Sequence, residues 1–292
     1  MRSLLFVPAD SERKLAKALT SDADALILDL EDSIALSAKQ NARKGAAAFL
    51  AAHASAQGFR LIVRINALDT GLADADLDAV VGQRPYAIML PKASGGADVQ
   101  HLSAKIAVRE AENNLEDGAI GIIPIATEHA GAVFTLGSYR GSSQRLVGMT
   151  WGAEDLAASV GATHNRESSG EFTSPFMLAR NMMLFGAAAA DVDAIDTVCA
   201  DFRNPDLMQR ECVEALRDGF TGKMAIHPDQ VAIINAVFTP SQQAVDEAQR
   251  VAAAFAASPD AGVLAIDGKM YDRPHLRSAE RLLKRAAAVR IA

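Results

Sequence analysis

The stretch Ala25-Leu-Ile-Leu-Asp-Leu-Glu-Asp32 joins a short apolar run to a cluster of carboxylates. An apolar run of this length is typical of a strand that is buried on both faces of a parallel sheet. Seven further runs of this kind occur at residues 3–7, 61–65, 86–90, 120–125, 146–151, 194–198 and 224–226. We therefore predict eight parallel strands.

Helices are predicted between these strands. The intervening stretches carry apolar residues three or four positions apart, as in Glu12–Leu19, Lys39–Ala54, Val99–Glu112 and Pro175–Gly186, and this spacing gives a helix one apolar face. Alternation of strand and helix repeated eight times predicts an α/β fold of the TIM (β/α)8 barrel type. A doubly wound open sheet is the alternative, but it needs no eighth unit, and no G-x-G-x-x-G motif follows the first strand.

The chain continues beyond the eighth run. We expect a helix at Ser241–Ala257, capped by Ser241, and a final Arg-rich helix from about Pro274. Residues 1–257 are predicted to form the barrel with its closing helix, and residues 258–292 a C-terminal lid or an arm that exchanges between subunits.

Composition excludes several classes of partner. The chain has 292 residues, a net charge of -7 and a pI near 5.4, so it offers no basic surface for nucleic acid. The apolar run Leu4–Val7 is too short for a signal peptide, and no later run has the ~18 apolar residues of a membrane span. We expect a cytoplasmic protein without a membrane partner, in which Cys199 and Cys212 are reduced thiols.

Two acids are candidate metal ligands. In a β/α barrel the active site lies at the carboxyl ends of the strands, and Glu128 and Asp155 follow the fifth and sixth runs, 27 residues apart. Two carboxylates completed by water and substrate oxygens commonly hold Mg²⁺, and Mn²⁺ accepts the same ligands. The alternative is that each acid only caps the next helix. Zinc is disfavoured because the histidines lack its ligand spacing.

Arg64 is a candidate substrate ligand. It ends the third run in Val63-Arg-Ile-Asn66, and a guanidinium in a barrel mouth needs an anion beside it. The acids Glu31 and Asp32 could be its structural partners. Both roles are compatible if Glu31 and Asp32 orient Arg64 and Arg64 contacts substrate.

Seven short motifs are spread over nearly the whole chain and include the candidate residues at the strand ends. They are Arg2-Ser-Leu-Leu-Phe-Val-Pro8, Leu28-Asp-Leu-Glu-Asp-Ser33 with Lys39 and Arg43 after it, Val63-Arg-Ile-Asn66, Leu90-Pro-Lys92, Gly152-Ala-Glu-Asp-Leu156, Gly219-Phe-Thr-Gly-Lys-Met-Ala-Ile-His-Pro228 and Asp267-Gly-Lys-Met-Tyr-Asp272. Together they resemble the citrate lyase β-subunit-like branch of the HpcH/HpaI aldolase/citrate lyase family, which includes malyl-CoA and citramalyl-CoA lyases.

The resemblance implies a barrel with a C-terminal lid, usually a homo-oligomer (a trimer or hexamer), that binds Mg²⁺ and a coenzyme A or acyl-carrier thioester. The family's metal ligands fall on Glu128 and Asp155, and its substrate arginine falls on Arg64. The main-chain amides of Glu154 and Asp155 would hold the carboxylate of a 2-oxo acid. The family's acid/base falls on Asp272, which in relatives reaches a neighbouring subunit. The contacts to coenzyme A fall on Phe6, Lys17, Ile226 and His227.

The expected activity is therefore cleavage of a 3-hydroxyacyl-CoA, such as a malyl, citramalyl or citryl thioester, into an acyl-CoA and a 2-oxo acid, or the reverse condensation. Two alternatives remain open. One is a malyl-CoA thioesterase or malate-synthase-like activity at the same site. The other is a non-catalytic subunit of a citrate lyase complex.

Overall fold

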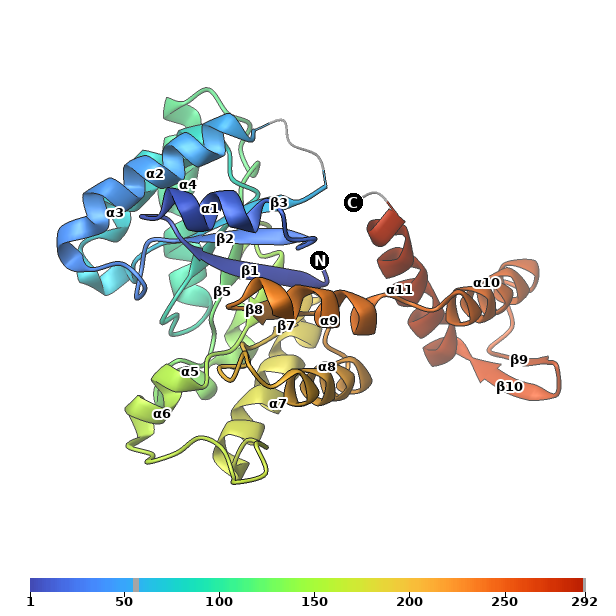
Figure 1. The fold of residues 1–292 in the computed structure, drawn as a ribbon. Helices are drawn as coiled ribbons and strands as arrows, with labels where there is room; N and C mark the ends of the chain where they lie inside the picture. Colours follow the sequence, from blue (N-terminus) through green and yellow to red (C-terminus); the bar gives the residue numbers. More distant parts are fainter. Residues whose placement is uncertain (55–57, 291–292) are drawn as a thin grey trace.

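In the computed structural model, which describes residues 1–54 and 58–290, eight parallel strands surround a common axis (Figure 1). They are β1 (Ser3–Pro8), β2 (Ala25–Asp29), β3 (Arg60–Arg64), β4 (Ala87–Leu90), β5 (Gly121–Pro124), β6 (Gly148–Thr150), β7 (Asp193–Asp196) and β8 (Gly222–Ala225). Their order is β5-β4-β3-β2-β1-β8-β7-β6. Parallel bridges from Ile122 to Leu146 and from Ile125 to Thr150 join β5 to β6 and close the ring. The barrel prediction is confirmed.

Helices surround the barrel and cover its outer face. The longer ones are α1 (Glu12–Ala18), α2 (Lys39–Ala52), α3 (Ala73–Val80), α4 (Gly96–Glu112), α6 (Glu154–Val160), α7 (Ser174–Ala190), α8 (Pro205–Asp218) and α9 (Pro228–Phe238), and α5 is the single turn Ala130–Val133. The alternation of strand and helix predicts α8 between the seventh and eighth runs, but we gave residue ranges for neither α8 nor α9. Both begin with Pro after a polar capping residue, Asn204 or His227, which is a helix-start signal that could have located them.

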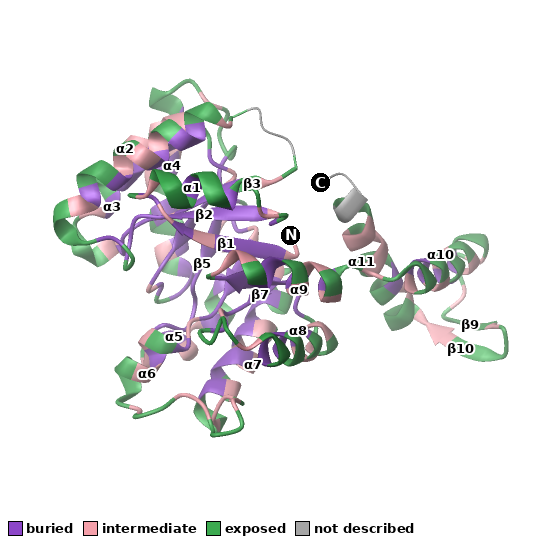
Figure 2. Ribbon diagram, viewed as in Figure 1, coloured by how far each residue is buried: buried purple, intermediate pink, exposed green. Residues whose placement is uncertain are grey.

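Side chains of each strand alternate between two cores. Leu4, Ile27, Ile62 and Met89 fill the barrel interior, whereas neighbours such as Leu5 pack outward against the helices. Figure 2 shows this buried layer at the centre of the molecule. Because both faces of every strand are covered, the strands are largely apolar, which explains the apolar runs in the sequence. Buried charged residues on the strands are paired, as Lys223 of β8 is with Asp196 of β7.

The C-terminal residues form a separate arm, consisting of α10 (Gln242–Ala257), the hairpin β9 (Val263–Ile266) and β10 (Lys269–Asp272), and α11 (Arg273–Arg290). Figure 1 shows the arm projecting from the barrel. We grouped α10 with the barrel from the sequence, but in the structure its buried residues Val251 and Phe255 form a small core with Ala279 of α11. The last two residues of the predicted lid, 291–292, lie outside the described part of the chain. Within that part, no helix is long and apolar enough to cross a membrane.

Candidate active site

The carboxyl ends of β2 and β3 bring an arginine and two acids together. Arg64 donates from Nε and Nη2 to the two oxygens of Asp29, both at 2.7 Å, and its Nη1 lies 3.0 Å from Glu31 Oε2. Burial disfavours charge on both partners, but the bidentate contact outweighs it, so the pKa of Asp29 is lowered and that of Arg64 is raised. Arg64 is therefore a fixed cation with a defined orientation.

Of the two acids expected to pair with Arg64, the structure confirms one and contradicts the other. Glu31 contacts it, but Asp32 does not, and Asp32 lies instead 3.2 Å from Lys92 Nζ. Asp29, to which we assigned no role from the sequence, supplies the bidentate contact. Asp29 is the last residue of β2 and pairs in register with Arg64 of β3, so adjacent strands position the two side chains at the same level.

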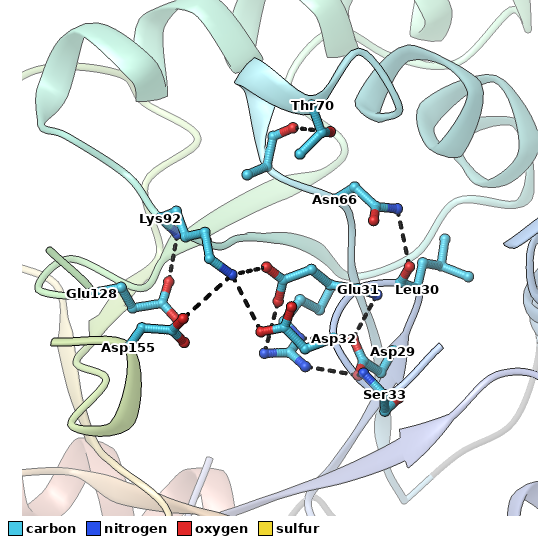
Figure 3. Close-up of polar contacts among 12 residues, drawn as sticks. Asp29, Leu30, Glu31, Asp32, Ser33, Asn66, Thr70, Lys92, Glu128 and Asp155 are labelled. Atoms are coloured by element: carbon cyan, nitrogen blue, oxygen red, sulfur yellow. Dashed lines mark hydrogen bonds and ion pairs between the residues drawn. The ribbon is translucent and has the colours of Figure 1, made fainter. Parts of the chain in front are cut away.

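A buried lysine holds the loop that carries these acids. Lys39 Nζ donates to the carbonyl oxygens of Leu30 (2.7 Å) and Glu31 (2.8 Å) and to Asn66 Oδ1 (2.7 Å). Asn66 donates in turn to Leu30 O (Figure 3) and to the buried carboxylate of Asp76. All three ammonium protons therefore have acceptors, which fixes the loop after β2 and explains why the Lys39 and Asn66 motifs accompany the acids.

Glu128 lies across the mouth from Arg64 and is 5 % exposed. Burial raises the pKa of Glu128 to about 8, and the carboxylates of Glu31 and Asp155 add to the shift. The main-chain N–H of Lys92 donates to Glu128 Oε2 at 2.5 Å. A Cβ on Gly152 would come within 2.7 Å of Glu128 Cγ, so the glycine of the Gly152-Ala-Glu-Asp motif leaves room for this carboxylate.

Asp155 is close to Glu128, as both lie on one side of Lys92 (Figure 3). It occupies the first turn of α6, whose N-cap is Ala153. The amides of Glu154 and Asp155 are thus the first two of the helix and lack intrahelical acceptors, as a carboxylate ligand would require. The Glu154 side chain accepts instead from Asn165 Nδ2 at 2.9 Å.

Lys92 is a further residue of the mouth, to which we assigned no role from the sequence. This residue follows β4 with a left-handed backbone, φ 53°, which is unfavourable for a residue with a side chain. Its ammonium lies 2.5 Å from Glu31 Oε1, 3.2 Å from Asp32 Oδ2 and 3.7 Å from Asp155 Oδ1. The signal in the sequence was its motif, Leu90-Pro-Lys92 at the end of a strand, to which we assigned no chemistry.

The residues present fit a divalent ion. Among the described residues no group of three His, Cys, Asp or Glu side chains could hold a metal, so the pair Glu128 and Asp155 would need water and substrate oxygens to complete a coordination shell. Such a partial oxygen shell suits Mg²⁺ or Mn²⁺ and does not suit a structural zinc ion. A bound cation would also offset the repulsion from Glu31 and Asp155, which adds to the effect of burial on the pKa of Glu128.

A cavity of about 630 Å³ opens beside the mouth, and all four residues expected to contact coenzyme A line it. They are Phe6, Lys17, Ile226 and His227. Arg13 and Lys14 add two cations to the lining. The ring of Phe6 also lies under the Arg64 guanidinium, 4.8 Å from ring centroid to Cζ, and therefore connects the cavity with the mouth. His227 has a second role, because its Nδ1 caps α9 by accepting from Asp229 N–H.

Asp272 is not part of the mouth of its own barrel. It ends β10 on the arm, where its carboxylate contacts His275 Nδ1 at 2.5 Å. This contact lowers the pKa of Asp272, whereas a carboxylate that acts as general acid and base near neutral pH needs a raised pKa. The raised value requires burial, which the single chain does not give this half-exposed side chain.

Known proteins resemble this chain over nearly its full length. The family model HpcH/HpaI aldolase/citrate lyase matches residues 2–228. The chain is 34 % identical over 287 residues to the citrate lyase subunit beta of Escherichia coli, covering 98 % of this chain and 93 % of that protein. It is 32 % identical over 307 residues to the mitochondrial citramalyl-CoA lyase of Rattus norvegicus, covering 99 % and 87 %.

A solved structure supports the same assignment. CitE from Mycobacterium tuberculosis, in complex with magnesium, acetoacetate and coenzyme A, superposes with a TM-score of 0.76 at 32 % identity and covers 98 % of both chains. Fold, motif order and sequence identity over almost the full length agree, so this chain belongs to the HpcH/HpaI aldolase/citrate lyase family.

Proposed function

We propose that this protein is a Mg²⁺-dependent lyase that cleaves a 3-hydroxyacyl-CoA thioester into an acyl-CoA and a 2-oxo acid, or catalyses the reverse condensation. The observation that supports this proposal most directly is the order of groups across the mouth. A coenzyme-sized cavity leads past Phe6 to the fixed cation Arg64, and the carboxylates Glu128 and Asp155 lie beyond it.

The thioester would enter with its coenzyme A portion in the cavity. The cations Arg13, Lys14 and Lys17 of α1 suit its phosphates, and the apolar lining near Phe6 suits its pantetheine arm. Arg64 is then placed to stabilise the oxygen of the thioester when that oxygen becomes an enolate. Because Asp29 and Glu31 hold the guanidinium in place, little reorganisation is needed when this charge develops.

The other half of the substrate would lie between Glu128 and Asp155. Mg²⁺ held there would act as a Lewis acid that stabilises negative charge on the hydroxyl and carboxylate oxygens. The free amides of Glu154 and Asp155 would orient the carboxylate of the oxo-acid half. In cleavage the C3 hydroxyl loses its proton to solvent and becomes the carbonyl of the 2-oxo acid as the bond between C2 and C3 breaks. The electron pair of that bond passes to the thioester as an enolate, and Asp272 of a neighbouring subunit protonates C2. A homo-oligomer, a trimer or hexamer, is part of this proposal.

Hydrolysis of the thioester is the second candidate. The (3S)-malyl-CoA thioesterase of Cereibacter sphaeroides is 32 % identical to this chain over 292 residues, so the family site is associated with both reactions. The two activities differ in their products, since a lyase releases acyl-CoA and a 2-oxo acid, whereas a thioesterase releases free coenzyme A and a hydroxy acid.

The test is product identification with a panel of malyl-, citramalyl- and citryl-CoA in the presence and absence of Mg²⁺. We expect acyl-CoA and oxo acid, with activity lost in excess chelator. Glu128→Gln and Asp155→Asn should each abolish turnover while the protein keeps its far-ultraviolet circular dichroism spectrum. Full activity in chelator would refute the metal assignment, and release of free coenzyme A alone would favour the thioesterase.

A further inference from the structure

We propose that Lys92 is the internal counter-ion of the metal site: its ammonium neutralises the mouth carboxylates in the absence of a divalent ion and thereby weakens the binding of that ion. This inference rests on the proposed metal site at Glu128 and Asp155. It adds a residue that sets how tightly the site holds its ion.

The first observation is that Lys92 contacts both proposed ligands. Its main-chain N–H donates to Glu128 Oε2 at 2.5 Å, and its ammonium lies 3.7 Å from Asp155 Oδ1. The left-handed backbone at φ 53° makes this double contact possible. Such a conformation is costly for lysine and persists where the surrounding structure imposes it, often at functional sites.

The second observation is the charge around the ammonium. Besides Asp155, the carboxylates of Glu31 and Asp32 lie within 3.2 Å of Nζ. Figure 3 shows Lys92 between Glu31 and Asp32 on one side and Glu128 and Asp155 on the other. Arg64, the other cation of this cluster, is engaged by Asp29 and Glu31, so Lys92 is the cation that offsets the charge of the proposed metal ligands.

The third observation is that the ammonium is accessible and able to move. The Lys92 side chain is 35 % exposed, in contrast to 6 % for Glu31. A lysine ammonium is a point charge on a flexible stem. When a divalent ion binds Asp155, this stem can turn away from Asp155 and keep its contacts with Glu31 and Asp32, so no buried charge is left unpaired.

The direction of the effect follows from Coulomb's law. Removing one positive charge beside the site strengthens the attraction for any cation, and a divalent ion gains twice as much as a proton. Removal of the Lys92 charge therefore increases the affinity for the divalent ion whether or not a proton leaves when the ion binds. A purely structural role for Lys92 predicts the opposite, because a variant with a disordered site would bind the ion more weakly.

The test is titration of the purified protein with MgCl₂ alone by isothermal calorimetry. Lys92→Met removes the charge and keeps the main-chain N–H, and we expect the Kd for Mg²⁺ to fall on the order of three- to tenfold. Lys92→Gly should tighten binding to the same extent, since it also keeps the N–H and accepts a positive φ without strain. Lys92→Arg, which keeps the charge, should bind like the wild type.

Lys105→Met is the matched control. Lys105 forms an ion pair with Asp74 at 2.9 Å on the outer helices, so its removal changes the net charge equally without touching the mouth. Unchanged or weaker Mg²⁺ binding in Lys92→Met, beside normal binding in the wild type, would overturn the role of Lys92 and leave the metal site intact. Absence of Mg²⁺ binding in the wild type and all variants would overturn the metal site and this inference together.

Discussion

The orientation of the Arg64 guanidinium is set by its contacts with two neighbouring carboxylates. The cation is 13 % exposed and is held by three contacts, two from Asp29 and one from Glu31. A lysine at this position could supply the charge, but not the fork of donors that reaches both acids. The side chain is therefore a structural ion pair, one of the two roles considered from the sequence, and its fixed orientation suits the proposed second role, contact with substrate.

Arg64→Lys should accordingly reduce both stability and rate. We expect a loss of about 1.5–3 kcal/mol in the free energy of unfolding, because charged hydrogen bonds are lost. We also expect a fall in kcat of roughly a hundredfold or more, as for loss of an oxyanion donor. Urea denaturation and steady-state kinetics on the same preparations measure the two effects. Kinetics close to wild type in a destabilised variant would assign Arg64 to structure alone.

At the scale of elements, the seam between β5 and β6 needs support from outside the sheet. Arg145, in the loop before β6, donates to both oxygens of Glu110 on α4 at 2.8 and 2.6 Å. Glu110 also accepts from the N–H groups of Gly118 and Ile120. This buried ion pair ties α4 to the two strands that are joined only by isolated bridges.

Loss of this pair should destabilise the fold in a pH-dependent way. Burial alone would raise the pKa of Glu110, but the bonds from Arg145, Gly118 and Ile120 outweigh it and lower the pKa below its usual 4.5. A lowered pKa contributes stability that is present above pH 4.5 and is lost as the pH falls through the folded-state value. We expect Glu110→Gln to cost about 3–5 kcal/mol at pH 7, and the difference from wild type to shrink below pH 4.5.

Urea denaturation at pH 7 and at several acid pH values measures this difference. Asp117→Asn is the control, because Asp117 also contacts Arg145 but is 89 % exposed, and exposed ion pairs contribute about 0–1 kcal/mol. A gap between wild type and Glu110→Gln that stays constant down to pH 3 would contradict the assignment.

At the scale of the molecule, the arm points away from its own active site. Asp272 directly precedes α11, and further along this helix Arg281 lies 3.8 Å from Asp191, the C-cap of α7. Asp191 precedes β7, so it lies at the amino ends of the strands, opposite the mouth. The helix after Asp272 thus leads toward the base of its own barrel. This geometry favours action of Asp272 on a neighbouring subunit.

Mixing two inactive variants tests that arrangement. Asp272→Ala and Glu128→Gln should each be inactive alone, whereas subunit exchange should restore activity in up to about a quarter of the sites of a random oligomer. Size-exclusion chromatography with differently tagged chains verifies exchange. No recovery after verified exchange would mean that each arm serves its own barrel, and an active Asp272→Ala variant would remove Asp272 from the mechanism.

A truncation that removes the arm should remove α10 together with α11, because the two helices share one small core. Removal of residues 258–292 would expose Val251 and Phe255 of α10, which pack against α11 in the structure. A cut after Thr239, the C-cap of α9, removes the arm with its own core and leaves the barrel core covered.

The order of apolar runs and polar residues along the chain was sufficient to predict the barrel and several residues of its mouth. Strands buried on both faces are largely apolar, so eight apolar runs predicted eight strands, and the polar residues at and after their ends predicted the mouth. Glu128, Asp155 and Arg64 could be selected on this basis because strand ends in a barrel converge whatever the details of packing. The family motifs added the residues of the coenzyme cavity and Asp272.

The pairing of these groups could not be predicted, because it depends on strand register and backbone conformation in the folded chain. Asp29 rather than Asp32 holds Arg64 because register aligns the last residues of β2 and β3. Lys92 reaches Glu128 and Asp155 because its backbone is left-handed, which no spacing in the sequence records. The placement of α10 with the arm depends on contacts with α11, since an amphipathic helix shows that it has an apolar face but not which partner covers it.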